Sequence, residues 1–281
     1  MIIRALRITL SILLLGLAFE SQSAPKAELW DRWLAHDAES EETINHHAWG
    51  QLLNKYVAEG QDNLNRVAYQ QVTHQDKYAL KQYIKNISKR PISRFNRQQQ
   101  RAFWINLYNA LTVDIILDHY PVKSILEIKL SSGLFTRGPW KKKIVTIEEE
   151  ELSLDDIEHR ILRPIWQDPR THYAVNCASI GCPNLSKQAF TAQNMDEQLN
   201  RAAESYINHP RGAEINKGKL VVSSIYEWFK EDFEGDDQGV IRHLKQYAKP
   251  ELLKQLVTIQ RIDDDQYDWQ LNEYNVRATR Q

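Results

Sequence analysis

The sequence has few cysteines, glycines and prolines, and its charges nearly cancel. Of 281 residues only 2 are cysteine, 10 are glycine and 9 are proline. Two cysteines are too few for a disulfide scaffold, and the scarcity of glycine and proline excludes collagen-like and low-complexity chains. The 36 Lys and Arg residues against 37 Asp and Glu residues give a net charge of −1, without the basic excess that binding a phosphate backbone requires. We therefore expect no nucleic-acid partner.

Long hydrophobic runs are also scarce, and the clearest one is close to the N-terminus. Two arginines precede an apolar run over residues 8–19, and small residues follow it. This order is typical of a secretory signal, and a run of roughly 12 residues is short for a spanning helix, which needs about 20. We expect residues 1–24 to be a signal peptide cleaved near Ser23 or Ala24, with a membrane anchor and a buried helix as alternatives. The mature protein would then be periplasmic or secreted, with no stable membrane span after cleavage.

Residues 25–281 contain no internal repeat and no linker, which predicts a single domain. Helices and strands do not alternate regularly, so we expect an α+β fold: a helix-rich single domain with a small mixed or antiparallel sheet. Capping and periodicity signals predict helices over 28–37, 45–58, 75–87, 97–120, 153–163, 194–208, 224–229, 240–247 and 251–256. Asn96 is the predicted cap of the 97–120 helix, and Ser153 with Asp156 is expected to cap the 153–163 helix, which Pro164 should close. Strands or extended segments are predicted over 140–147, 171–177, 220–223 and 258–271.

The segment THYAVNCASIGCPNL, residues 171–185, concentrates the reactive side chains. A predicted strand leads through His172 to Cys177, and a loop of small residues follows, whose amides could face a developing oxyanion. A thiol nucleophile needs a base, and His172 is the nearest candidate in sequence. Strand alternation, however, places His172 and Cys177 on opposite faces, so either the loop corrects this or a histidine distant in sequence is the partner of the thiol. We expect Cys177 to be the nucleophile if the protein is an enzyme.

Three other interpretations of the cysteines stay open. In an oxidising compartment Cys177 and Cys182 could form a disulfide, or both could be packed core thiols. A metal site is the third, with His159, His172 and both cysteines as ligands. Their spacing matches no zinc motif known to us, so we predict neither a metal nor a cofactor.

Two further sets of polar residues are candidates for the site. Asn106 and Asn109 lie three residues apart on an apolar helix, where they could orient a catalytic histidine or bind the backbone of a packed loop. His159 and Arg163 are i, i+4 neighbours, which could bind an anionic group or lie on a solvated side.

Two aromatic groups accompany these polar residues: Tyr226, Trp228 and Phe229 in one segment, and Tyr267 and Trp269 in the other. They are expected in the core, with a cleft for a sugar or a peptide as the alternative.

Several stretches resemble one known family. They are FWINLYNALTV (103–113), GPWKKK (138–143), LSLDDIEHRIL (152–162), DPRTHYAVNCASIGCPNL (168–185), NHPRG (208–212), SSIYEWFKEDF (223–233) and YDWQLN (267–272). In these stretches the chain resembles the bacterial secreted form of domain-of-unknown-function family 547, and the best match covers residues 95–272. The resemblance implies that the His172–Cys182 region is a motif, and it implies no reaction.

Together these patterns predict an exported cysteine-dependent hydrolase or acyltransferase that acts on an amide or thioester-like bond. Its substrate would be a small molecule, a peptide or a component of the cell envelope. The competing hypothesis is a non-enzymatic envelope-binding module in which a Cys177–Cys182 disulfide is structural. A thiol–disulfide exchanger is a weaker third, because redox proteins usually carry C-x-x-C.

Overall fold

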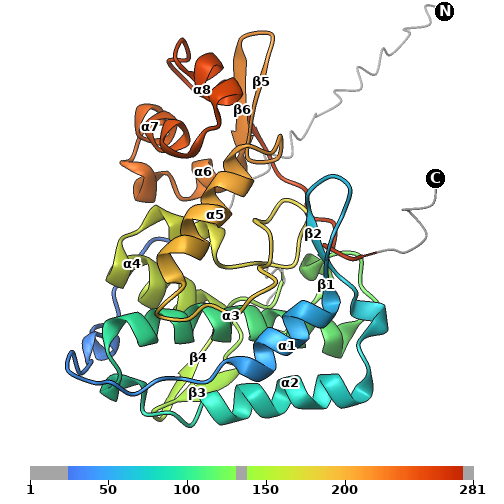
Figure 1. Cartoon of the computed structure of the whole chain (residues 1–281), viewed down its shortest axis with the longest axis vertical. Helices are drawn as coiled ribbons and strands as arrows, with labels where there is room; N and C mark the ends of the chain where they lie inside the picture. The colour runs from blue at the N-terminus through green and yellow to red at the C-terminus, as the bar shows by residue number, and fades with distance from the viewer. Residues whose placement is uncertain (1–24, 131–137, 275–281) are drawn as a thin grey trace, which may run out of the picture.

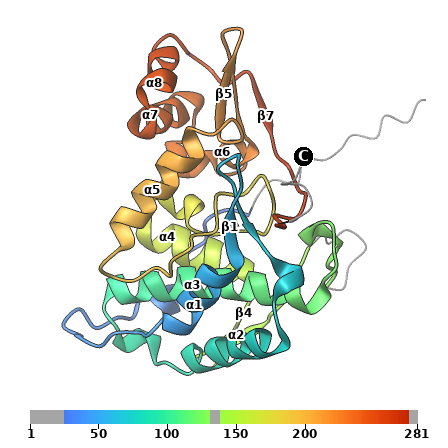
Figure 2. The same ribbon diagram turned by 45° about the vertical axis from the view of Figure 1, so that its right-hand side comes forward.

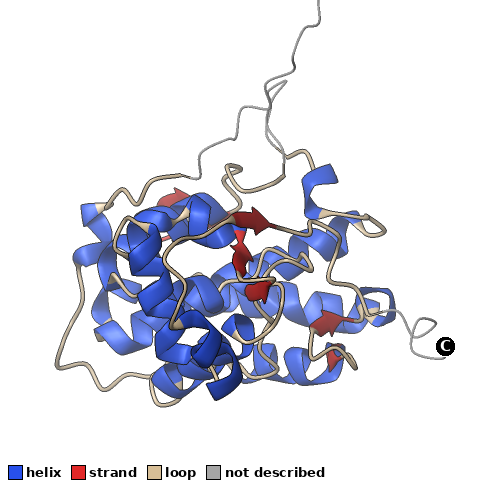
Figure 3. Ribbon diagram, turned by 90° about the horizontal axis from the view of Figure 1, so that it is seen from above, coloured by secondary structure: helices blue, strands red, loops and turns tan. Residues whose placement is uncertain are grey.

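The computed structural model describes residues 25–130 and 138–274, so the predicted signal of residues 1–24 lies outside the described residues. Helices dominate and the strands are short, as Figure 3 shows by colour. The fold is α+β, as predicted, and combines the helices with small two- and three-stranded sheets. Within the described ranges, no helix has both the length and the apolar character needed to cross a membrane.

The longest helix, α3 (Arg97–His119), forms the centre of the larger hydrophobic cluster (Figure 1). Its predicted cap is confirmed, because the side chain of Asn96 accepts a hydrogen bond from the backbone N–H of Gln99 at 3.0 Å. Side chains all round its middle are buried, Phe103 and Trp104 among them, because other elements pack on every side. The helix therefore supplies a rigid base for the loops that cross it.

Most predicted helices are confirmed with shifted ends. They are α1 (His47–Tyr56), α2 (His74–Ile87), α5 (Met195–Ile207), α6 (Ser224–Trp228), α7 (Asp237–Tyr247) and α8 (Pro250–Leu256). The helix predicted over 28–37 is wrong, since only Asp31–Leu34 forms a 3-10 turn. The cap of α6 is Ser223, whose hydroxyl accepts from the amide of Ile225.

The strands form three small sheets. β1 (Val57–Glu59) pairs antiparallel with β2 (Asn65–Val67), and β3 (Val145–Ile147) with β4 (Glu150–Leu152). In the third sheet β5 (Ala213–Asn216) is antiparallel to β6 (Lys219–Ser223), and β6 is parallel to β7 (Asp264–Gln266), so this sheet is mixed (Figure 2). Only part of the predicted 140–147 strand forms.

A second hydrophobic cluster is built from α5, α7 and the β5–β6–β7 sheet. The chain passes between the clusters at residues 173–174, because Tyr173 belongs to the second and Ala174 to the first. The strand predicted over 171–177 is wrong: Pro169–Tyr173 is a 3-10 helix and the rest is irregular. A strand would need a partner strand for its amides, whereas here the amides of Asn176 and Cys177 bind the side chains of Asn109 and Cys182. The motif thus lies where the two clusters meet.

The helix predicted over 153–163 extends to Trp166, and its middle, Asp156–Leu162, is a π-helix followed by α4 (Arg163–Trp166). The predicted cap is confirmed, since Ser153 and Asp156 exchange hydrogen bonds between side chain and backbone N–H. The expectation that Pro164 closes the helix is wrong. In the wider π turn the amide of Arg163 pairs with the carbonyl of Glu158, five residues back, and the chain continues past the proline.

Candidate functional site

The cysteine loop turns sharply immediately after Cys177. Ala178 has φ of +60°, a left-handed conformation that a residue with a Cβ adopts only where its surroundings enforce it. The side-chain carbonyl of Asn176 accepts the amide of Ala178 at 2.9 Å, and the carbonyl of Ala178 accepts the amide of Asn272. Cys177 therefore lies at the start of a sharp turn that these two hydrogen bonds hold in place.

The two thiols are close together but not bonded to one another. The amide of Cys177 donates to the Sγ of Cys182 at 2.8 Å, while the Sγ of Cys177 contacts the hydroxyls of Tyr267 at 3.0 Å and Ser179 at 3.2 Å. Cys182 is only 4% exposed and Cys177 is half-buried. Both sulfurs are free in this structure, and Cys177 is the more accessible of the two.

The thiols differ in acidity. Burial raises the pKa of Cys177 well above its usual value, and the hydrogen bonds of Ser179 and Tyr267 only partly oppose this. Burial also acts on Cys182, but hydrogen bonds from Cys177 and Tyr267 bring its pKa below the usual value. Cys177 is thus protonated at neutral pH and needs a base before it can attack.

The two helix asparagines bind backbone. Asn106 donates to the carbonyl of Phe190 at 2.7 Å and accepts its amide at 3.0 Å. Asn109 donates to the carbonyl of Ala174 and accepts the amide of Asn176, both at 2.8 Å. Among the described residues neither amide contacts His172. Asn109 instead fixes the backbone that leads into Cys177.

His172, the predicted base, is engaged elsewhere. Its Nε2 lies 2.6 Å from Oδ2 of Asp232, and its ring stacks on Phe229 with centroids 4.5 Å apart. The Nε of Arg163 donates to the same carboxylate oxygen at 2.6 Å. Burial opposes ionisation of Asp232, but the hydrogen bonds from His172 and Arg163 hold its pKa well below the usual range. No described contact joins His172 to Cys177.

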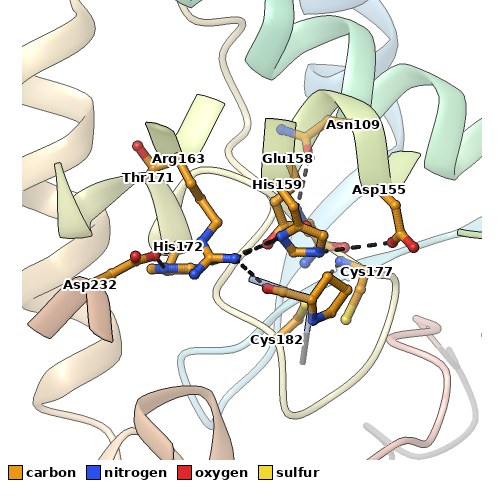
Figure 4. A network of polar contacts seen from close by, with 12 residues as sticks. Asn109, Asp155, Glu158, His159, Arg163, Thr171, His172, Cys177, Cys182 and Asp232 are labelled. Atoms are coloured by element: carbon orange, nitrogen blue, oxygen red, sulfur yellow. Dashed lines mark hydrogen bonds and ion pairs between the residues drawn. The ribbon is translucent and has the colours of Figure 1, made fainter. Parts of the chain in front are cut away.

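His159 and Arg163 are both buried, so the solvated-side alternative is wrong. The Nη1 of Arg163 donates to Nδ1 of His159 at 3.0 Å (Figure 4). Burial lowers the pKa of His159 to about 4, so the ring is neutral at physiological pH. Since Nδ1 accepts a hydrogen bond, the single ring proton must be on Nε2. His159 is therefore a hydrogen-bond donor at Nε2.

Asp155 lies on that side of the ring, with Oδ1 3.8 Å from Nε2 of His159. Burial, reinforced by the nearby charge of Glu158, raises the pKa of Asp155 to about 7. No hydrogen bond to its carboxylate comes from any side chain in the described ranges. A carboxyl that is only partly ionised at pH 7 is suited to proton transfer.

The helix cluster and the thiols meet at Tyr108 of α3. Burial raises the pKa of Tyr108 well above its usual value, and the charges of Glu158, Cys177 and Cys182 add to this effect. Figure 4 shows His159, Asp155, Cys177 and Cys182 in one part of the network, with His172 and Asp232 in the other. In this view the two thiols are drawn on the side of Asp155 and His159, and His172 and Asp232 lie on the other side of Arg163.

Four half-buried aromatic side chains form a chain of contacts that leads from Asp155 to Cys177. The carbonyl of Trp140 accepts the amide of Asp155, and the ring of Trp140 lies 5.9 Å from that of Trp269. Trp269 packs on Tyr267 at 4.7 Å, and the hydroxyl of Tyr267 contacts the sulfur of Cys177. Trp228 stacks on Trp269 at 5.6 Å. We call Trp140, Trp228, Tyr267 and Trp269 the aromatic wall.

Sequence reasoning missed Asp155, Asp232 and Trp140. Asp155 precedes His159 by four residues, the same spacing that singled out Arg163, so this signal was present. Asp232 is 60 residues from His172, and no local pattern could pair them. Within the described residues, no three His, Cys, Asp or Glu side chains converge as metal ligands.

Residues 92–207 match the model of the family described as "Protein of unknown function, DUF547". The matched range contains α3, the π-helix and the cysteine loop, whereas Asp232, Trp228, Tyr267 and Trp269 lie beyond it. No curated protein and no solved structure matches the chain.

Proposed function

We propose that this chain, which belongs to the DUF547 family through residues 92–207, is a cysteine-dependent hydrolase or acyltransferase acting on an amide or thioester-like bond. The observation that carries the proposal is the Asp155–His159 pair. One carboxyl has a pKa of about 7, and the neutral imidazole beside it presents an N–H. These groups supply a base and an oxyanion donor, and Figure 4 draws the half-buried thiol of Cys177 on their side of the network.

In the proposed reaction, the carboxylate of Asp155 takes the proton of the Cys177 thiol. The sulfur attacks the acyl carbon, and the developing oxyanion accepts a hydrogen bond from Nε2 of His159. As the bond to the leaving group breaks, Asp155 returns the proton to that group, and a thioester on Cys177 is left. Water or an acceptor amine or alcohol then attacks the thioester by the same steps and restores the thiol.

The remaining polar residues hold this arrangement in place. Arg163 fixes the proton of His159 on Nε2, and Asp232 holds Arg163 together with His172. His172 is thus assigned to positioning rather than to proton transfer. This assignment replaces the Cys177–His172 pair that the sequence suggested.

The aromatic wall supports a binding surface beside the nucleophile. Partly exposed Trp and Tyr rings bury large areas of a ligand at low entropic cost, and their polar edges still contact water. A substrate with an apolar or ring-shaped portion would pack here while its acyl carbon faces Cys177.

The proposal is tested with an activated ester, p-nitrophenyl acetate, and a short peptide thioester. We expect an acetyl group on Cys177, located by mass spectrometry, and release of more than one product per protein molecule. Cys177→Ser should abolish both, and Asp155→Asn should slow acylation by about 10²–10⁴-fold. Asp265→Asn, on the exposed strand β7, is the control. A folded protein that is never acylated would instead be a binding module.

We also propose that the protein is exported, which rests on the N-terminal sequence pattern alone. N-terminal sequencing of protein recovered from the periplasm or medium should start near residue 24 or 25. An intact Met1 on such protein would contradict cleavage.

A further inference from the structure

Residues 25–30, which we call the N-terminal strap, lie along the helix that carries His159 and Arg163. The amide of Glu28 donates to the carbonyl of His159 at 2.9 Å, and the amide of Trp30 donates to the carbonyl of Arg160 at 3.1 Å. The Nη1 of Arg163 donates to the carbonyl of Pro25 at 2.7 Å, from the same nitrogen that holds His159. The strap thus binds through alternate amides and one carbonyl.

Pro164 leaves the carbonyl of His159 without a partner inside the helix. In the π turn each amide pairs with the carbonyl five residues back, as that of Arg163 does with Glu158. Pro164 has no N–H, so the carbonyl of His159 lacks this partner, and buried carbonyls without a partner are costly. The carbonyl of His159 instead accepts the amide of Glu28 from the strap.

The strap contacts the helix mainly through its backbone. Side chains 25–29 are exposed, and only Trp30 is half-buried, under the guanidinium of Arg160 at 4.4 Å from its ring. Recognition therefore depends on amides and a carbonyl that any extended peptide carries, plus one aromatic anchor. Arg163 is 2% exposed with the strap in place.

We infer that the carbonyls of His159 and Arg160 and the guanidinium of Arg163 form a binding site for an extended peptide, in which the strap is an intramolecular occupant. The inference rests on the proposed function in one respect, namely that the bound peptide is the substrate of Cys177. A substrate peptide then takes the place of the strap, and its carbonyl is held by Arg163 beside His159. Peptide binding itself needs no chemistry at the thiol.

The test uses a chain that begins at Asp31, which keeps every described helix and strand, and that carries Cys177→Ser so that no acyl transfer occurs. The probe is the acetylated hexapeptide PKAELW, residues 25–30, with a fluorophore on its lysine. Fluorescence anisotropy should show saturable binding to the shortened chain, and binding to the full chain should be at least about tenfold weaker because the tethered strap competes.

Two N-methylated peptides make the matched control. Methylation of the Glu28 amide removes a donor to His159 and should weaken binding about tenfold or more. Methylation of the Ala27 amide, which has no acceptor in the described residues, should change the affinity of the peptide less than about twofold.

If the shortened chain does not fold, the full chain with Glu28→Pro replaces it, with Ala27→Pro as its control. The Glu28→Pro chain should bind the labelled peptide more tightly than the control does. The absence of binding to every folded variant, or equal binding of both methylated peptides, would overturn the inference. Because all binding is measured without the thiol, a failure of acyl transfer leaves this result unaffected.

Discussion

Arg163 donates a hydrogen bond to Nδ1 of His159 at 3.0 Å, and this contact sets which imidazole nitrogen carries the proton. The ring is neutral because burial lowers the pKa of His159 to about 4. The ring proton is therefore on Nε2, the nitrogen that lies 3.8 Å from Oδ1 of Asp155. A base with a pKa near 7 and a neutral donor together suit proton transfer at physiological pH.

Asp155→Asn should stabilise the protein at alkaline pH. Folding raises the pKa of Asp155 to about 7, against about 3.9 for an unfolded carboxyl. The native state therefore binds more protons than the unfolded state between these values, and stability falls as the pH rises through that window. The variant lacks this loss and should be more stable at pH 8 by up to about 4 kcal/mol.

Urea melts at pH 8 and near pH 4 measure this difference. Near pH 4 both proteins carry a neutral group at position 155, so their free energies of unfolding should agree within about 0.5 kcal/mol. A gain of the same size at both pH values would show that the carboxyl of Asp155 is not the cause.

Asp232→Asn should destabilise the fold strongly. The carboxylate of Asp232 serves both His172 and Arg163, and the side chain of Arg163 is 2% exposed. Removal of one partner of a buried charge typically costs about 3–5 kcal/mol. Asp265→Asn, on exposed β7, should cost less than about 0.5 kcal/mol. Thermal melts that show equal small losses would mean that the Asp232 network contributes no stability.

Cys177 should react with iodoacetamide before Cys182 in the native protein, because Cys182 is 4% exposed and Cys177 is half-buried. Cys177→Ser should fold normally and lose the rapid alkylation, whereas Cys182→Ser should keep at least part of it. A disulfide predicts a different result: the two variants would be equally destabilised, and reductant would reproduce the loss in the wild type. Melts with and without reductant decide between the two.

Trp104→Ala should lower the free energy of unfolding by about 3–5 kcal/mol, the usual cost of deleting a buried aromatic side chain. Trp104 is 1% exposed and packs against Trp33 and Phe103 at 5.0 and 4.8 Å between ring centroids. Lys142→Ala, on an exposed side chain, should change stability by less than about 0.5 kcal/mol. If denaturant melts showed equally small losses of stability for Trp104→Ala and Lys142→Ala, α3 would not be central to the core.

Local signals in the sequence were sufficient for the helices. The Asn96 cap and the Ser153–Asp156 capping box both form as predicted, because a cap depends on residues three positions apart. The strand predicted over 171–177 fails because its apolar residues are buried between two clusters, and burial alone does not distinguish a strand from an irregular segment. The helix continues past Pro164 because of a π turn, and the periodicity of the sequence does not predict such a turn.

The site was predicted only in part, for a related reason. The cysteine loop and the His159–Arg163 pair are local in sequence, and the structure brings both pairs into contact. The partners that set their chemistry are distant: Asp232 and Tyr267 approach from the C-terminal third of the chain. These distant partners are identified only in the folded structure, where His172 is hydrogen-bonded to Asp232.

The most direct test of the account is the pH dependence of Cys177 acylation by p-nitrophenyl acetate in the wild type and in Asp155→Asn. If the carboxylate of Asp155 takes the thiol proton, the wild-type rate rises as Asp155 ionises, with an inflection near pH 7, and then levels off. The variant should be slower and should show no inflection in that range. Identical profiles for the two proteins, or a wild-type rate that rises only with the thiol's own ionisation above pH 9, would contradict the assignment of Asp155 as the base.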